Sequence, residues 1–154
     1  MDFHQAPFIV IWETTQACDL ACVHCRAKAQ PLPLPGELSR EEGLALLDDI
    51  AEMGTKVCVL SGGDPLKRAE LLELIRHGKA RGLRMATIPA ATPLLTREII
   101  KVLKGTGLDQ MALSLDASTP EAHDRFRSVP GVFKKTLEAI QWAHEAELPL
   151  QINT

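Results

Sequence analysis

The sequence predicts an α/β fold in which a parallel sheet is covered by outer helices. Short apolar runs typical of buried strands alternate along the chain with segments whose apolar residues have helical spacing. The second, third and fourth strand-like runs begin roughly 27 residues apart, at Lys56, Leu83 and Gln110. The chain has 154 residues, 45% of them hydrophobic and 24% charged, which is the balance of one folded domain. Such strand–helix alternation is typical of a parallel sheet with right-handed crossovers.

The first strand is predicted over residues 7–12, which are apolar, β-branched or aromatic. A Pro-rich stretch over residues 31–36 leads to the first helix. Ser39 and Glu42 have the spacing of a capping box, so we expect this helix to begin there and to end at Gly54.

The later elements repeat this alternation of strand and helix. The second strand covers residues 56–60, and the turn 61–65 joins it to a helix over about 67–81 that Gly82 ends. The others are predicted in chain order as strand 83–88, a helix from Thr96 to about Gly105, strand 110–115, a short helix from Ser118 or Thr119, helix 132–147 and strand 149–154.

No helix follows the fifth strand, residues 149–154. Because an α/β domain does not usually end within a strand, we expect residues 1–154 to be the N-terminal part of a longer protein. A complete five-stranded domain is the alternative.

Composition argues against several classes of protein. Seventeen Lys and Arg against twenty Asp and Glu give a net charge of −3, which disfavours a nucleic-acid surface. The chain has no Tyr and only 4% aromatic residues, so base-stacking platforms are not expected. No apolar run is long enough to span a membrane, and residues 1–5 do not resemble the start of a secretory signal. The sequence therefore predicts a cytoplasmic protein.

Three of the four cysteines, Cys18, Cys22 and Cys25, lie within eight residues directly after the first strand. Three thiolates on one tight loop can hold three irons of a [4Fe–4S] cluster and leave the fourth iron open to another ligand. Zinc with His24 as fourth ligand is the alternative, but adjacent residues such as His24 and Cys25 seldom reach one tetrahedral ion together. The remaining cysteine, Cys58, lies in an apolar run and is expected in the core.

Two further groups of residues follow strands. Gly62 and Gly63 would allow close approach of the backbone to a ligand, whereas Asp64 could simply cap the next helix. Ser114 and Asp116 share one side of the fourth strand and could bind the two hydroxyls of a ribose, unless Asp116 caps the following turn. All these residues lie at the C-terminal edge of a parallel sheet, where active sites of α/β proteins form.

With these residues the chain resembles the radical S-adenosylmethionine (SAM) superfamily. Cys18, Cys22 and Cys25 match its cluster motif, residues 62–64 match its Gly-Gly-Glu motif with a shorter acid, and Ser114 and Asp116 match its ribose-facing positions. Longer segments are similar to the subgroup that often carries a C-terminal SPASM domain: Glu13-Thr14-Thr15, Ser61-Gly62-Gly63-Asp64-Pro65-Leu66, Ser114-Leu115-Asp116-Ala117 and His123-Asp124-Arg125-Phe126-Arg127.

The resemblance implies a partial (β/α)6 barrel that is truncated in its fifth strand. It also implies a [4Fe–4S] cluster whose open iron binds the amino and carboxylate groups of SAM. One electron then cleaves SAM to methionine and a 5′-deoxyadenosyl radical, which abstracts hydrogen from a substrate. In this reading Gly62, Gly63 and Asp64 hold the SAM amino group, His24 lies near the adenine, and Arg127 meets the carboxylate unless it is a solvated loop residue. No residue is assigned a catalytic role beyond the cluster and SAM.

The implied partners are SAM, a substrate that is a peptide or a small molecule such as a tetrapyrrole or cofactor precursor, and an electron donor. The donor would be a reductase, a flavodoxin or a ferredoxin. We expect residues 1–154 alone to be inactive, because the rest of the barrel would complete the adenine and substrate pockets. Two alternatives are a zinc-binding α/β module and a non-catalytic homologue that only binds a partner.

Overall fold

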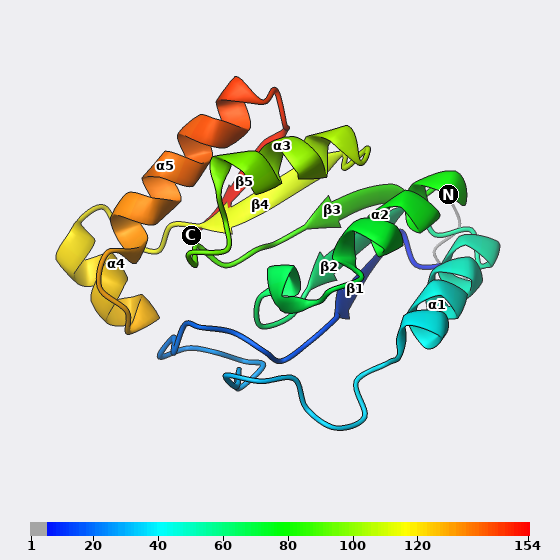
Figure 1. Cartoon of the computed structure of the whole chain (residues 1–154), viewed down its shortest axis with the longest axis horizontal. Coiled ribbons are helices and arrows are strands. Elements are labelled where there is room, and N and C mark those ends of the chain that lie inside the picture. The colour runs from blue at the N-terminus through cyan, green and yellow to red at the C-terminus, as the bar shows by residue number, and fades with distance from the viewer. Residues whose placement is uncertain (1–5) are drawn as a thin grey trace.

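Five parallel strands in the order β1-β2-β3-β4-β5 form one sheet in the computed structural model, which describes residues 6–154 (Figure 1). The strands are β1 (Ile9–Glu13), β2 (Val57–Ser61), β3 (Arg84–Thr87), β4 (Gln110–Ser114) and β5 (Leu150–Asn153). This confirms the predicted α/β class and the parallel sheet. The prediction that the N-terminus is not a secretory signal rests on residues 1–5, which lie outside the described residues.

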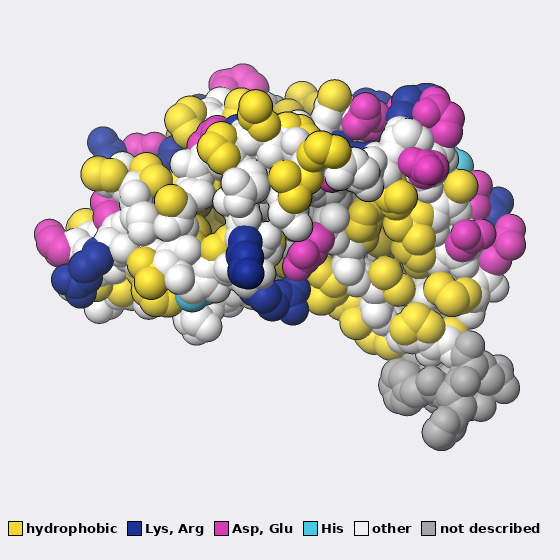
Figure 2. Space-filling view, turned by 90° about the horizontal axis from the view of Figure 1, so that it is seen from below, with side chains coloured by type: hydrophobic (Ala, Val, Ile, Leu, Met, Phe, Trp, Pro, Cys, Tyr) yellow, Lys and Arg dark blue, Asp and Glu magenta, His cyan; other side chains and the backbone are white. Residues whose placement is uncertain are grey.

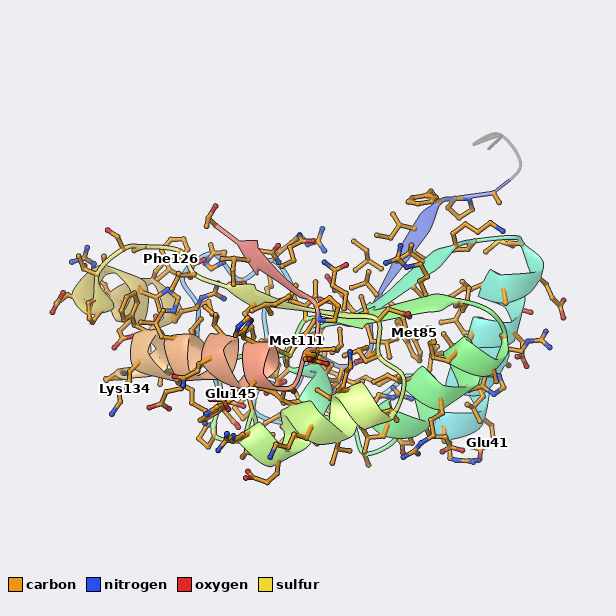
Figure 3. All side chains as sticks on the ribbon, turned by 90° about the horizontal axis from the view of Figure 1, so that it is seen from above. Glu41, Met85, Met111, Phe126, Lys134 and Glu145 are labelled. Atoms are coloured by element: carbon orange, nitrogen blue, oxygen red, sulfur yellow. The ribbon has the colours of Figure 1, made fainter. Side chains whose placement is uncertain are left out.

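The helices α1, α2, α3 and α5 pack on one face of the sheet, as the view from above shows (Figure 3). The helices are α1 (Arg40–Glu52), α2 (Leu71–Ala80), α3 (Arg97–Gly105), α4 (Pro120–Arg127) and α5 (Val132–Glu145), with a short 3-10 turn, η1 (Pro65–Lys67). Along β1, side chains on the opposite face alternate with those that pack toward the core, and Ile11 is 57% exposed. None of the described helices has the length and apolar character of a membrane span.

The predicted capping residues begin their helices. The Oγ of Ser39 accepts from the Glu42 amide at 3.2 Å, and the Glu42 carboxylate accepts from the Ser39 amide at 2.7 Å, which completes the capping box of α1. Thr96 caps α3, and Thr119 rather than Ser118 caps α4. Each cap satisfies an amide that the first helical turn leaves unpaired.

The helix predicted over residues 67–81 is interrupted. Asp64 caps η1, and Arg68 then has extended backbone angles, φ −86° and ψ 117°. The helix α2 therefore begins only at Leu71. This break turns the side chain of Arg68 back toward the loop that follows β1, where it bonds to the carbonyl oxygen of Thr14.

The core lies between the sheet and the helices. Fully buried side chains from the strands, Leu60, Met85 and Leu113, pack with Leu74 of α2 and Ile100 of α3. Burial of apolar area of this kind is the main favourable contribution to folding. The Cys58 side chain belongs to the same core, as expected from its apolar neighbours, and burial raises the pKa of its thiol to about 11.

Gly43 in α1 provides a test of this packing. A Cβ on Gly43 would lie 2.8 Å from the ring of Trp12, so we expect Gly43→Ala to destabilise the protein by about 1–3 kcal/mol through overpacking. Gly105→Ala is the matched control, because no atom lies within 4 Å of a Cβ at that position in α3. The control should stabilise by about 0.5–1 kcal/mol, since Ala is the better helix former. Denaturant unfolding measures both, and equal effects of the two substitutions would contradict the packing described.

Candidate functional site

A cavity of about 250 Å³ lies at the C-terminal edge of β1 and β2. Its walls come from the loop after β1, the turn after β2 and the end of α4. The residues singled out from the sequence that line it are Cys18, Cys22, His24, Cys25, Gly62, Gly63 and Arg127. Folding thus brings together residues that are more than a hundred positions apart.

The two glycines of the turn are required by the chain itself. The Gly63 amide donates to the Thr15 carbonyl at 2.7 Å, and the Asp64 amide donates to the Ala17 carbonyl at 2.7 Å. A Cβ on Gly62 would overlap the carbonyl oxygen of Thr15, and one on Gly63 would lie 2.5 Å from that of Ala17. The sequence predicted that the two glycines would let a ligand approach closely. In the structure they let the turn approach the cysteine loop, residues 14–39, which carries Cys18, Cys22 and Cys25.

Residues 15–18 are held on their other side by the returning arm of the same loop. The Cys18 amide donates to the Gln30 carbonyl at 2.7 Å, and the Gln30 amide donates to the Gln16 carbonyl at 2.8 Å. This forms a short parallel bridge between Ala17 and Gln30. The segment that carries Cys18 is thus fixed between the glycine turn and Gln30.

Each of the three loop thiols accepts a hydrogen bond from an N–H group. Leu20 donates its amide to Cys18 Sγ at 3.4 Å, Ala29 donates to Cys25 Sγ at 3.3 Å, and the Arg127 guanidinium donates to Cys22 Sγ at 3.5 Å. Burial raises the pKa of the Cys18 thiol, although the bond from the Leu20 amide works in the opposite direction. The three N–H groups thus point at the sulfur atoms that would ligate a metal as thiolates.

Arg127 connects the cysteine loop to the end of β4. It forms a fork on the Asp116 carboxylate, with Nε to Oδ2 at 2.6 Å and Nη2 to Oδ1 at 2.7 Å. Burial works against its charge, but the bonds to Asp116 and Cys22 outweigh this and raise its pKa. Arg127 is the last residue of α4 and only 13% of its side chain is exposed, so it is not a solvated loop residue. Within residues 6–154, these three bonds leave two of its five N–H groups without a partner.

The structure gives the Asp116 side chain a protein partner in place of the ribose hydroxyls that the sequence suggested. Its carboxylate is engaged by Arg127, and its amide donates to Nδ1 of the buried His123 at 3.1 Å. The alternative role of Asp116 as a cap of the following turn is not seen, because its two carboxylate oxygens accept from Arg127, and Thr119 caps α4. Ser114 lies at the end of β4 and lines a small adjoining pocket that Arg127 also borders. Asn153 of β5 is paired with Ser114 in register, and it is a further polar residue at this edge that the sequence patterns did not indicate.

The Asp64 side chain points away from the cavity. Its carboxylate is fully buried and accepts from the Leu66 amide at 3.1 Å, the Ala90 amide at 3.4 Å and the Thr92 hydroxyl at 2.8 Å. Burial raises the pKa of this carboxyl above its ordinary value. Asp64 is therefore the cap that the sequence offered as the alternative. Any contact of this position with a ligand in the cavity falls to the backbone of the turn.

The tip of the cysteine loop, at Val23 and His24, contacts Phe126 of α4. The His24 ring stacks on Phe126 with centroids 4.2 Å apart and an angle of 15° between the planes, and the Val23 amide donates to the Phe126 carbonyl at 3.0 Å. Phe126 was missed as a site residue, although it belongs to the 123–127 segment that resembles the family. Within residues 6–154 no three His, Cys, Asp or Glu side chains are close enough to share one ion. The tetrahedral site considered for zinc is thus not assembled there.

Curated relatives are similar to this sequence over nearly the whole chain. The AdoMet-dependent heme synthase of Oleidesulfovibrio alaskensis is 41% identical over 146 residues, which are 95% of this chain and 37% of the relative. The PqqA peptide cyclase of Rhodopseudomonas palustris is 35% identical over 150 residues, 96% of this chain and 39% of the relative. The chain therefore spans less than half the length of these curated relatives.

The fold is also similar to a solved structure. Streptococcus suis SuiB bound to S-adenosylmethionine superposes with a TM-score of 0.83 at 15% identity, over 97% of this chain and 34% of that one. A likeness at this identity supports the fold alone, which is that of part of a radical SAM barrel. The family model described as Radical SAM superfamily matches residues 12–154. This chain belongs to the radical SAM superfamily.

Proposed function

We propose that the chain is the cluster- and SAM-binding part of a radical SAM enzyme. The observation that carries this proposal is the convergence, in one cavity, of Cys18, Cys22 and Cys25 with the Gly62–Gly63 backbone and Arg127. The cysteines would supply three thiolates, and the glycines and the arginine would bind a small polar ligand beside them. All three features belong to the family motif regions.

The donor set fits a [4Fe–4S] cluster. Each thiol faces the shared cavity and has its own N–H donor, so three thiolate charges can be held near one another. Cys18, Cys22 and Cys25 would each ligate a different iron. When bound, the cluster supplies the electron that splits SAM into methionine and a 5′-deoxyadenosyl radical. The contribution of the chain is to hold the thiolates, orient SAM and exclude water.

The residues around the thiols can divide the recognition of SAM among them. The two free N–H groups of Arg127 would meet the carboxylate. The backbone of Gly62 and Gly63 would receive the amino group, while Ser114, with Asn153 beside it, would face the ribose. His24, exposed on its Phe126 platform, would lie near the adenine. Asp116 would act through Arg127, which it orients by its bidentate bond.

We also propose that residues 1–154 are the N-terminal part of a larger radical SAM core. The coverage of the relatives supports a larger core, since the matched region is 37% and 39% of their lengths. The face of the sheet opposite the helices supports it too, because Ile9 and Ile11 are 46% and 57% exposed there. The separate chain would be inactive, since the remaining strands would complete the SAM and substrate pockets.

The substrate of the intact protein would be a tetrapyrrole, with a peptide as the second candidate. Identity to a heme synthase is 41%, against 35% to a peptide cyclase, and this difference favours the first. The electron would come from a reductase, a flavodoxin or a ferredoxin, and the protein would act in the cytoplasm. A non-catalytic homologue would keep the iron but not cleave SAM, whereas a zinc module would take up no iron.

Loss of one cluster ligand tests the central assignment. In the intact protein, reconstituted anaerobically, Cys22→Ala should abolish the dithionite-dependent release of 5′-deoxyadenosine and should lower the iron content by several atoms per chain. Cys58→Ala is the control, because Cys58 lies in the core away from the cavity. The control should retain both the iron and the release. Release of 5′-deoxyadenosine that persists in Cys22→Ala would exclude the proposed cluster.

The role of Arg127 is tested by affinity for SAM. Arg127→Lys removes the fork and should raise the Kd for SAM by about tenfold or more, since charge-assisted bonds are worth about 1.5–3 kcal/mol. Arg125→Lys is the matched control on the same helix, where the side chain is exposed. Equilibrium binding to the reconstituted protein measures both. An unchanged Kd in Arg127→Lys would remove this residue from the binding site.

A further inference from the structure

The cysteine loop, residues 14–39, is closed at its base by a buried arginine from outside the loop. Arg68 Nη1 donates to the Thr14 carbonyl at 2.9 Å, and Nη2 donates to the carbonyls of Leu38 at 2.8 Å and Ser39 at 3.2 Å. Thr14 is where the chain leaves β1, and Ser39 is where it enters α1. One guanidinium thus joins the two ends of the segment that carries Cys18, Cys22 and Cys25.

The guanidinium of Arg68 is held through its two terminal nitrogens, whereas its buried Nε has no hydrogen-bond partner within residues 6–154 and lies 3.6 Å from the Glu70 carboxylate. The side chain is only 6% exposed, and its Cζ lies 5.1 Å from the centroid of the Trp12 ring. Gly43 leaves the space beside it, since a Cβ there would be 3.3 Å from Nη2. A lysine could not reach three carbonyl groups in this planar arrangement. The guanidinium is therefore held in one place and orientation.

Glu37 adds a second connection across the same loop. One oxygen of its carboxylate, Oε1, accepts from the Thr15 hydroxyl at 3.1 Å, the Gln16 amide at 2.8 Å and the Leu34 amide at 3.0 Å. Burial opposes the charge of Glu37, but these bonds and the nearby charge of Arg68 lower its pKa overall. The carboxylate therefore links the outgoing arm of the loop to the returning arm.

The loop has few apolar contacts of its own to hold it. Within residues 6–154, the buried apolar cluster there consists of Cys18, Leu20 and Val132, and Val132 belongs to α5. Five partly buried residues pack against it: Cys22, Ala29, Ala90, Ala91 and Val129. Val23 and Leu32 are each 73% exposed, and Figure 2 shows hydrophobic side chains spread over this lower face of the molecule among a few charged ones. Closing a loop costs conformational entropy that the contacts at its base must offset. The polar bonds at the base thus add to a small apolar cluster.

We propose that Arg68, assisted by Glu37, is a positioning residue that closes the base of the cysteine loop and so preorganises its three thiols for their ligand. The nature of that ligand rests on the proposed function, whereas the closure of the loop does not. Arg68 does not line the cavity and touches no thiol, so it acts only through the backbone of the loop.

Thiol labelling of the intact protein without its cluster tests loop closure directly. Cys18 and Cys58 are 7% and 0% exposed, so both should react slowly with a maleimide in the parent protein. In Arg68→Met, Cys18 should react about tenfold faster while Cys58 stays slow, because the loop is released and the core is not. Arg40→Met is the matched control, since it removes a guanidinium fork from Glu73 between α1 and α2. The control should leave both rates unchanged.

Glu37→Ala serves as the second variant, because Glu37 lies on the loop outside the core and its loss should not unfold the protein. Glu37→Ala should also raise the rate of maleimide labelling at Cys18 but not at Cys58. The proposal is overturned if Cys18 stays slow in both variants, or if Cys18 and Cys58 accelerate together in both. The second result would mean that these residues stabilise the whole fold rather than the loop.

Iron retention separates this inference from the proposed function. If the parent protein takes up the cluster, Arg68→Met should lose iron to a chelator several-fold faster than the parent and Arg40→Met. Equal rates of iron loss would overturn the link between loop closure and ligand binding. If the parent takes up no iron, the proposed function fails, and the labelling rates still decide whether Arg68 closes the loop.

Discussion

The contact between the glycine turn after β2 and the backbone of residues 15–17 is the constraint on which the site depends. The turn can approach this closely only because positions 62 and 63 lack a side chain. Its two amides then fix the outgoing arm of the cysteine loop, and Gln30 fixes it from the other side. Cys18 is therefore held beside the end of β2 by bonds of the chain itself. The family motif that contains these glycines is, in this structure, first a support for the cysteine loop.

Around this support, charged side chains link segments that are distant in the sequence. Arg127 joins Cys22 to Asp116 at the end of β4, and Arg68 joins the two ends of the cysteine loop. Both guanidiniums are largely buried, and each has several oxygen or sulfur partners. An arginine suits this role because its donors are planar and fixed in direction. The geometry of the site is thus set mainly by polar bonds, while the apolar core sets the sheet beneath it.

Local patterns predicted the strands and the caps at Ser39 and Thr96, because these features depend on neighbouring residues. They also indicated that the three cysteines share one loop after the first strand. The break before α2 was not predicted, since it depends on Arg68 reaching a loop some fifty residues earlier. The same limit applies to Asp64 and Asp116. Their residue types suggested ligand contacts, but their partners, Thr92 and Arg127, are known only once the chain is folded. Sequence patterns indicated that the candidate site lies at the C-terminal edge of the sheet. Which side chains face the cavity there depends on long-range hydrogen bonds.

In the proposed function, three thiolates hold a cluster with one open iron at which SAM binds. Electron paramagnetic resonance of the reduced, reconstituted protein tests it most directly, recorded with and without SAM. Direct binding of SAM to the open iron should change the signal of the reduced cluster, because it changes the ligands of that iron. A cluster signal that is identical with and without saturating SAM would contradict the account.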